Sequence, residues 1–307
     1  MSLRRSVLYM PGANARAQDK ARALACDAVV LDLEDAVAPD AKAAARAQVA
    51  ATVRAGGFGH REVIVRLNGL DTPWGADDLA TFGPLAASLH APAAGAPADP
   101  AAPRLDALLF PKVESAAQIR ALRAQLAAHG AGAVPLWAMI ETPRAVLACA
   151  DIAAADAGLD ALVLGTTDLV AALRARHTVA RTEVLAALAH CVLVARAFDR
   201  CVLDGVHLDF RNLDSLRLAC EQARDLGFDG KTLIHPDQIA TANAVFGVGE
   251  AEVDHARRLL ATWNEALAQG KGVAVLDGKL IEGLHVREAE RVLAMAEAIG
   301  AGAPAAG

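Results

Sequence analysis

Eight short apolar segments recur along the chain, separated by longer amphipathic stretches. Near-continuous apolar runs in this arrangement are typical of parallel strands that crossover helices bury on both faces. At least six of the segments end in a charged or polar residue, which an ordinary core strand would not tolerate. The segments are Ser6–Met10, Ala28–Glu34, Glu62–Asn68, Ala107–Glu114, Val134–Glu141, Ala161–Asp168, Val202–Asp209 and Thr232–His235.

Eight β–α units in one chain predict an α/β fold of the (β/α)8 TIM barrel type. In such barrels the chemistry lies at the C-terminal ends of the strands, where the polar segment ends would gather. The chain of 307 residues suits one barrel plus an appendage, and we expect the barrel to span residues 1–247 and to be the catalytic domain.

The pattern changes after residue 247. Two short apolar runs around Asp277-Gly278 are typical of a β-hairpin. We expect residues 248–307 to form an arm that packs on a neighbouring subunit, with a disordered tail from about residue 300. The expected elements of the arm are a helix over Glu250–Gln269, strands at Val273–Leu276 and Leu280–Ile281, and a helix over Val286–Ile299.

One internal stretch, Ala86–Arg104, is rich in alanine and proline. Its prolines predict a mobile surface loop rather than a continuous helix, inserted after a helix that begins near Ala76.

Composition excludes several classes of partner. The net charge is −6 with no block of lysine or arginine, which argues against nucleic acid. No run approaches the ~18 apolar residues of a membrane span, and the apolar run before Pro11 is too short for a secretory signal, so we expect it to be the first strand. Five cysteines without CxxC spacing indicate buried, reduced thiols and a cytoplasmic protein.

The strongest candidates for chemistry are Glu141 and Asp168, which end the fifth and sixth expected strands. Neighbouring strands lie ~4.8 Å apart, so the two carboxylates can converge above the barrel. Two hard oxygen ligands with open positions suit Mg²⁺. Thr142-Pro143 predicts a helix that begins at once and fixes Glu141 at the rim. The alternative is that both acids only favour helix starts.

Arg66, near the end of the third strand, is flanked by apolar residues. Its planar fork fits a substrate carboxylate, or an enolate oxygen that gains charge in a transition state. The alternative, compatible with the first, is an ion pair with a rim carboxylate such as Glu34. Asp32, Glu34 and Asp35 form an acidic cluster whose repulsion a metal, Arg66 or a lysine would relieve.

Four further residues lie near strand ends. Lys112 and Glu114 could join the acidic network, and for Lys112 a structural ion pair is favoured over a Schiff base because no apolar pocket is evident to depress its pKa. His207 and His235 are each either a general acid–base or a hydrogen-bonded rim histidine. GxGxxG, Walker, GxSxG and HExxH motifs do not occur, which argues against nucleotide-dependent and serine-hydrolase chemistry.

Taken in order along the chain, these residues resemble the citrate lyase β-subunit-like (CitE-like) CoA-ester lyases of the HpcH/HpaI aldolase superfamily. The resemblance covers nearly the whole chain and depends on an ordered set of blocks. The blocks are Arg5–Gly12 (RSVLYMPG), Asp27–Val37 (DAVVLDLEDAV), Val65–Leu79 (VRLNGLDTPWGADDL), Phe110–Ser115 (FPKVES), Ile140–Pro143 (IETP), Leu164–Leu169 (LGTTDL), Gly230–Ile239 (GKTLIHPDQI) and Leu276–Val286 (LDGKLIEGLHV).

The resemblance implies roles for particular residues. Glu141 and Asp168 match the family's Mg²⁺ ligands. Arg66 matches the arginine that contacts the substrate and the thioester enolate. Asp277 matches an aspartate that reaches a neighbouring subunit's active site for acid–base catalysis.

The resemblance also implies the ligands and the assembly. Glu34 and Asp35 match residues near the metal's water shell. CoA is the family's ligand, and we expect the loop after the first strand to hold its phosphates through Asn14, Arg16 and Lys20. Family members form trimers or hexamers, so we expect a homo-oligomer.

The implied activity is reversible retro-Claisen cleavage of a malyl-, citramalyl- or citryl-like acyl-CoA to a 2-oxo acid and acetyl-CoA or a homologue. One alternative on the same scaffold is a malyl-CoA thioesterase or a malate synthase-like enzyme. Others are a citrate lyase β subunit acting on a carrier-bound citryl group and a CoA-independent pyruvate aldolase. A non-catalytic binding module is the least favoured, because it would not need opposed charges at so many strand ends.

Overall fold

The computed structural model describes residues 2–89 and 99–302. The chain divides into two compact units, Arg4–Asn243 and a second unit formed by residues 2–3 together with the part from Ala244 onward. The division falls within helix α10 (Ile239–Phe246), and each unit has its own core.

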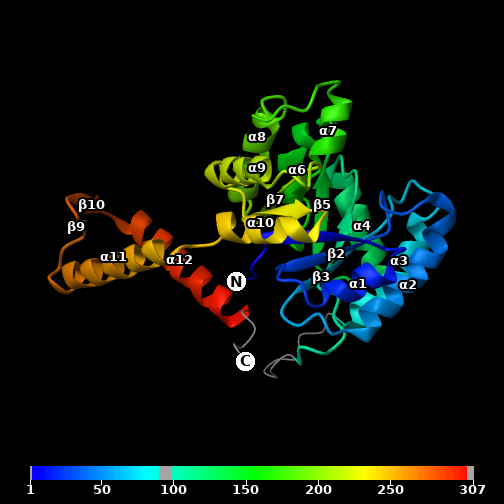
Figure 1. The fold of residues 1–307 in the computed structure, drawn as a ribbon, viewed down its shortest axis with the longest axis horizontal. Helices are drawn as coiled ribbons and strands as arrows, with labels where there is room; N and C mark the ends of the chain where they lie inside the picture. The colour runs from blue at the N-terminus through cyan, green and yellow to red at the C-terminus, as the bar shows by residue number, and fades with distance from the viewer. Residues whose placement is uncertain (1, 90–98, 303–307) are drawn as a thin grey trace. The chain divides into compact units, whose positions relative to one another are not determined.

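The larger unit is a closed barrel of eight parallel strands in sequence order, with β8 paired to β1 (Figure 1). The predicted TIM barrel is therefore confirmed. The strands are β1 (Ser6–Pro11), β2 (Ala28–Asp32), β3 (Glu62–Arg66), β4 (Ala107–Phe110), β5 (Leu136–Ile140), β6 (Leu159–Leu164), β7 (Cys201–Asp204) and β8 (Gly230–Leu233).

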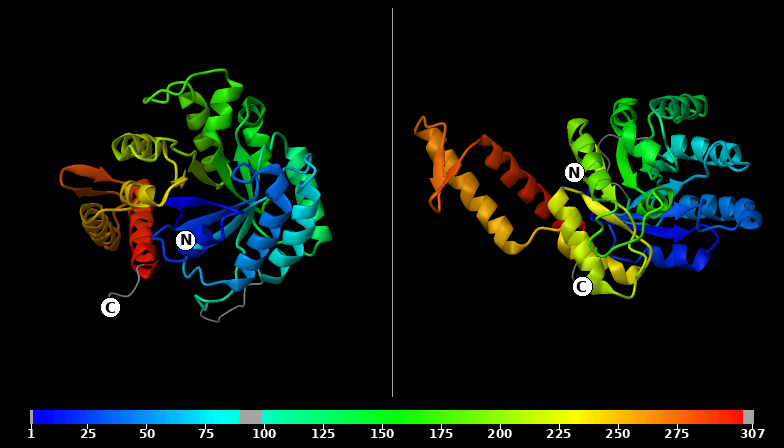
Figure 2. Two further views of the ribbon diagram at one scale, coloured as in Figure 1. Left: turned by 45° about the vertical axis from the view of Figure 1, so that its right-hand side comes forward. Right: turned by 90° about the horizontal axis from the view of Figure 1, so that it is seen from above.

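Each strand is followed by one or more helices, which lie on the outside of the barrel (Figure 2). They bury the outer faces of the strands, which explains the near-continuous apolar runs. They are α1 (Ala15–Ala21), η1 (Pro39–Ala41), α2 (Lys42–Ala55), α3 (Gly75–Leu89), α4 (Ala116–Ala128), α5 (Pro143–Leu147), α6 (Cys149–Ala154), α7 (Thr166–Ala172), α8 (Leu185–Ala197), α9 (Leu213–Leu226), η2 (Pro236–Gln238) and α10.

The barrel interior is filled by alternate residues of the strands. Val7 and Tyr9 of β1 pack in one cluster with Val30, Trp137 and Met139. This period of two follows from the pleat of a strand. The lumen is therefore a packed core, and a substrate site can lie only at an end of the barrel.

Several strands end earlier than the apolar pattern predicts. β2 ends at Asp32 rather than Glu34, and β7 ends at Asp204 rather than Asp209. The expectation that Asp168 ends a strand is wrong, because β6 stops at Leu164 and Asp168 lies in the first turn of α7. An acidic residue is favoured in that turn by the helix dipole, which moves the carboxylate from the strand to the helix start.

The helix before the alanine- and proline-rich stretch is longer than predicted. α3 begins at Gly75 and continues to Leu89, with Pro84 inside it, so the loop predicted over Ala86–Leu89 is helix. The helix buries Phe82, Leu85 and Ala86, and this burial outweighs the hydrogen bond lost at the proline. The remainder of the predicted loop includes residues 90–98, which lie outside the described residues.

The smaller unit contains the predicted helix, hairpin and helix. The hairpin turn has positive φ at Asp277 (49°) and Gly278 (76°), as a type I′ turn requires. The last helix begins earlier and ends later than predicted, so the tail expected from residue 300 starts within it, and residues 303–307 lie outside the described part. The elements are α11 (Glu250–Ala268), β9 (Ala274–Leu276), β10 (Lys279–Ile281) and α12 (Gly283–Gly302).

The expectation that the cysteines are unpaired is confirmed. All five cysteines are free, and all but Cys201 are buried. Within residues 2–89 and 99–302, no helix is both long and apolar enough to cross a membrane.

Candidate active site

Glu141 immediately follows β5 at the C-terminal end of the barrel. As predicted, Thr142 caps α5 by accepting a hydrogen bond from Ala145, and Pro143 begins the helix. The Glu141 side chain is buried, and its Oε1 accepts a hydrogen bond of 2.7 Å from the main-chain N–H of Lys112. This local structure fixes the carboxylate at the rim.

Asp168 reaches the same part of the rim from α7. Its half-exposed carboxylate lies with Oδ2 3.9 Å from Nζ of Lys112. Glu141 and Asp168 therefore both contact Lys112, one through the main chain and one through the side chain. The strand order brings the two acids together because they follow neighbouring strands β5 and β6.

Gly165, which precedes α7, makes room for Glu141. A Cβ at position 165 would lie 2.3 Å from Cβ of Glu141 and 2.5 Å from its Oε2. Any larger residue would displace the carboxylate. This requirement was not anticipated from the sequence. A glycine between a strand and the start of a helix can, however, indicate that another group packs closely against the backbone there.

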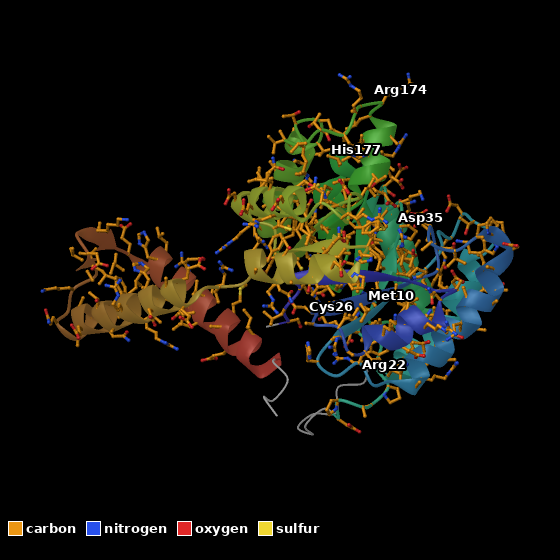
Figure 3. All side chains as sticks on the ribbon, in the orientation of Figure 1. Met10, Arg22, Cys26, Asp35, Arg174 and His177 are labelled. Carbon is orange, nitrogen blue, oxygen red and sulfur yellow. The ribbon has the colours of Figure 1, made fainter. Side chains whose placement is uncertain are left out.

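Arg66 is paired chiefly with Asp32, its partner in the β2–β3 register. Nε and Nη2 donate to the two carboxylate oxygens of Asp32 at 2.6 Å each, and Nη1 donates to Asp35 at 3.2 Å. The guanidinium also stacks over Tyr9, 4.8 Å from the ring centroid. Figure 3 labels Asp35 in this region of the barrel.

The electrostatic state of Arg66 follows from these contacts. Burial alone would lower its pKa, but the charge of Asp32 and the hydrogen bonds to it hold the pKa well above the ordinary value. The guanidinium is therefore a permanent, oriented charge at the rim. The structure contains the ion pair that was the alternative expectation, with Asp32 as its principal partner.

Glu34 lies between Arg66 and Lys112. Its Oε1 accepts a 2.7 Å hydrogen bond from Lys112, and its Oε2 lies 2.7 Å from Nη1 of Arg66 without the alignment of a hydrogen bond. Burial raises the pKa of Glu34 despite these cations. The ion pair predicted for Lys112 is confirmed, and because the contact with Glu34 outweighs partial burial and raises the pKa of Lys112, a Schiff-base role is not supported.

A buried lysine, Lys42, holds the loop that carries Glu34. Its Nζ donates to the carbonyl oxygens of Leu33 and Glu34 and to Oδ1 of Asn68, at 2.7–2.8 Å. Lys42 follows the Asp27–Val37 block and is part of the resemblance to the CitE-like enzymes, but its spacing does not predict this role.

The acids of the cluster lie close enough to influence one another's charge state. Burial raises the pKa of Glu141 to about 7, and the charges of Glu34 and Asp168 add to the shift. Among the described residues, no group of three or more His, Cys, Asp and Glu side chains is arranged to hold a metal. Two carboxylates would leave most positions for water and substrate oxygens, which is the mode of binding that Mg²⁺ prefers.

The remaining rim residues predicted from the sequence have ordinary partners. Glu114 accepts a 2.7 Å hydrogen bond from Thr142, outside the acid cluster. His207 Nε2 lies 2.8 Å from Ser215 Oγ, and burial lowers its pKa. His235 stacks on Phe210 at 4.7 Å and caps η2. Both histidines therefore fit hydrogen-bonded or stacked rim positions.

A cavity of about 230 Å³ adjoins α7 on the side of the β7–α9 loop. Thr166, Val206 and His207 are among its lining residues. Val206 also packs against the cluster that fills the barrel interior, which places the cavity at the barrel end that carries the acids.

The residues expected to hold CoA lie together on the α1 segment. Asn14 caps α1 by accepting a 3.0 Å hydrogen bond from Ala17, and Arg16 and Lys20 are exposed. Their role stays a prediction. In the other unit, Asp277 pairs with Arg258 at 3.0 Å, and both side chains are more than half exposed.

Asp204 and Lys231, partners in the β7–β8 register, form a buried ion pair that was not anticipated. The Lys231 ammonium lies 2.5 Å from Oδ2 of Asp204, and Arg181 pairs with the other oxygen. Lys231 and Arg181 outweigh burial and lower the pKa of Asp204. Lys231, a charged residue within the short strand β8, could have indicated a buried ion pair from the sequence.

The pattern of the HpcH/HpaI aldolase/citrate lyase family matches residues 5–102 and 98–236. The chain belongs to this family. A relative named (3S)-malyl-CoA thioesterase, from Cereibacter sphaeroides strain KD131, is 46% identical over 97% of this chain and 96% of its own length. The L-malyl-CoA/β-methylmalyl-CoA lyase of C. sphaeroides strain ATCC 17029 is 31% identical over 97% of this chain and 96% of its length.

A solved structure supports the same family. CitE from Mycobacterium tuberculosis, in complex with magnesium, acetoacetate and coenzyme A, matches 95% of this chain and 97% of its own with a TM-score of 0.72 and 28% identity. The resemblance to the CitE-like enzymes predicted from the sequence is confirmed.

Proposed function

We propose that this family member is an Mg²⁺-dependent enzyme that acts on a malyl-CoA-like thioester, with hydrolysis as its main reaction. The observation that carries the proposal is the 46% identity, over nearly the full length, to a malyl-CoA thioesterase. The rim geometry supports it, because two carboxylates and a fixed arginine charge lie together at one end of the barrel.

Glu141 and Asp168 are the residues that would hold Mg²⁺. The burial of Glu141 and the shared contact with Lys112 support this choice. When bound, the ion would polarise substrate oxygens as a Lewis acid. Glu34 and Asp35 would accept hydrogen bonds from waters and substrate groups around it.

The other residues of the chain bind and orient the substrate. Arg66, held by the two hydrogen bonds that it donates to Asp32, would direct a permanent positive charge toward the thioester oxygen. Asn14, Arg16 and Lys20 would meet the phosphates of CoA. Asp277 from a neighbouring copy in a homo-oligomer, a trimer or hexamer, would accept and return the proton.

In hydrolysis, a water oxygen bonds to the thioester carbon while the C–S bond breaks. Asp277 would take the proton from the water, and the CoA sulfur would receive a proton as it leaves. The products are the intact hydroxy acid and free CoA.

The second candidate is reversible retro-Claisen cleavage, which the 31% identical lyase favours. Asp277 would remove the proton of the 3-hydroxyl group, and the C2–C3 bond would break. A 2-oxo acid and a thioester enolate result, with the enolate charge stabilised by Arg66 and a proton then added to its carbon. Both candidates use the same binding residues, so they differ in the bond that breaks.

The test is to incubate the purified protein with malyl-CoA, citramalyl-CoA and 2-methylmalyl-CoA in Mg²⁺ and to identify the products by mass spectrometry. Free CoA with an intact hydroxy acid supports hydrolysis, whereas acetyl- or propionyl-CoA with a 2-oxo acid supports cleavage. Glu141→Gln and Asp168→Asn should each lower kcat/KM by about a hundredfold or more, with Glu221→Gln on α9 as a control. Unchanged activity in either site variant would contradict the proposal.

A further inference from the structure

Lys112 has a backbone conformation that a lysine rarely adopts. It follows the end of β4 with φ of +50°, in the left-handed region that costs a non-glycine residue roughly 1 kcal/mol. In this conformation its N–H donates to Oε1 of Glu141 at 2.7 Å. The unusual backbone conformation of Lys112 therefore orients the buried carboxylate of Glu141.

The side chain of the same residue contacts two other acids. Nζ lies 2.7 Å from Oε1 of Glu34 and 3.9 Å from Oδ2 of Asp168. Lys112 thus interacts with three of the rim carboxylates, Glu34, Glu141 and Asp168. The side chain is 53% exposed, so the ammonium lies at the surface of the cluster rather than within the core.

Charge at the rim is unbalanced. Asp32, Glu34, Asp35, Glu141 and Asp168 supply five carboxylates, and the cations in direct contact with them are Arg66 and Lys112. Arg66 is held by Asp32. A cation bound between the acids would therefore compete with the Lys112 ammonium for interaction with Glu34 and Asp168.

We propose that Lys112 is a positioning residue that sets the divalent-cation affinity of this site. Its main chain fixes Glu141, and its ammonium weakens cation binding by repulsion and by occupying one oxygen of Glu34. This inference rests on the metal site put forward under the proposed function. It predicts that removing the ammonium strengthens the binding of a divalent cation, the opposite of the usual effect of a substitution beside a metal.

The experiment is a Mn²⁺ titration of the full chain, followed by electron paramagnetic resonance of the free ion. Lys112→Met keeps the length of the side chain, the main-chain N–H and the cost of the positive φ, and it removes the charge together with the hydrogen bond to Glu34. Lys112→Arg keeps the charge. Arg144→Met is the matched control, because Arg144 is a rim cation that contacts Glu114, outside the acid cluster.

Lys112→Met should bind Mn²⁺ about tenfold more tightly than the unmodified chain, a modest value because the ammonium is half-exposed. The difference should shrink in 0.5 M KCl, where screening is strong. Lys112→Arg and Arg144→Met should stay within about threefold of the unmodified chain.

Equal or weaker Mn²⁺ binding by Lys112→Met would overturn the inference while leaving the proposed function in place. If the unmodified chain binds no Mn²⁺, the inference and the proposed metal site both fail. Circular dichroism of each variant establishes that the compared chains are folded.

Discussion

The burial of the Glu141 carboxyl group makes the free energy of unfolding depend on pH. Its pKa in the folded chain is about 7, above the ordinary 4.5, chiefly because burial disfavours the charged form. A carboxyl group with a raised pKa stabilises the folded state fully below its unfolded pKa, and this contribution is lost as the pH rises through the folded pKa. Glu141 should therefore weaken the metal-free protein between about pH 4.5 and pH 7.

Glu141→Gln mimics the protonated side chain and should remove this pH dependence. In EDTA at pH 8, we expect the variant to exceed the unmodified chain in free energy of unfolding by on the order of 3 kcal/mol, because a shift of one pKa unit corresponds to about 1.4 kcal/mol. At pH 4.5 the difference should be much smaller. Urea unfolding at the two pH values measures it.

Added Mg²⁺ gives the control for that measurement. It should raise the stability of the unmodified chain at pH 8 and leave Glu141→Gln unchanged, because only the former would bind the ion. A stability gap that does not depend on pH would contradict the role assigned to burial.

Strands were the elements best predicted from the sequence. The apolar runs predicted the locations of all eight barrel strands, because a strand that is buried on both faces consists almost entirely of apolar residues. Their ends were predicted less well, because residues such as Asp168 are polar whether they end a strand or begin a helix. The last residue of a strand and the first residues of a helix differ in their backbone hydrogen bonds. Those bonds cannot be predicted from the identity of a single residue.

Strand register explains what the sequence could not show about the site. Asp32 faces Arg66 across β2 and β3, and Asp204 faces Lys231 across β7 and β8. Each pair depends on residues far apart in the chain, so spacing alone predicted a charged cluster and left the partners open. The role of Gly165 could not be predicted either. It depends on the space that Glu141 occupies in the folded chain, which the spacing of residues in the sequence does not show.

At the scale of the whole molecule, the proposed catalytic residues belong to two separate units. Each unit has its own core; Glu141 is in the barrel unit and Asp277 is in the smaller unit. The proposal that Asp277 serves another copy of the chain predicts complementation. Asp277→Asn and Glu141→Gln should each be inactive alone, yet regain part of the activity when co-expressed, because mixed oligomers contain sites with both residues intact.

Activity assays of the co-purified variants, with each variant carrying a different affinity tag, measure this effect. Separately purified variants mixed only in the assay provide the control for slow subunit exchange. No recovery in verified mixed oligomers would show that Asp277 does not act across chains.

The central claim is that Glu141 and Asp168 share one divalent cation at the C-terminal end of the barrel. The most direct measurement is the anomalous X-ray signal of crystals soaked in Mn²⁺. We predict a single strong peak at the rim, about 2.1 Å from an oxygen of each carboxylate. A peak bound by other residues, or carboxylates of Glu141 and Asp168 too far apart to share an ion, would contradict the account.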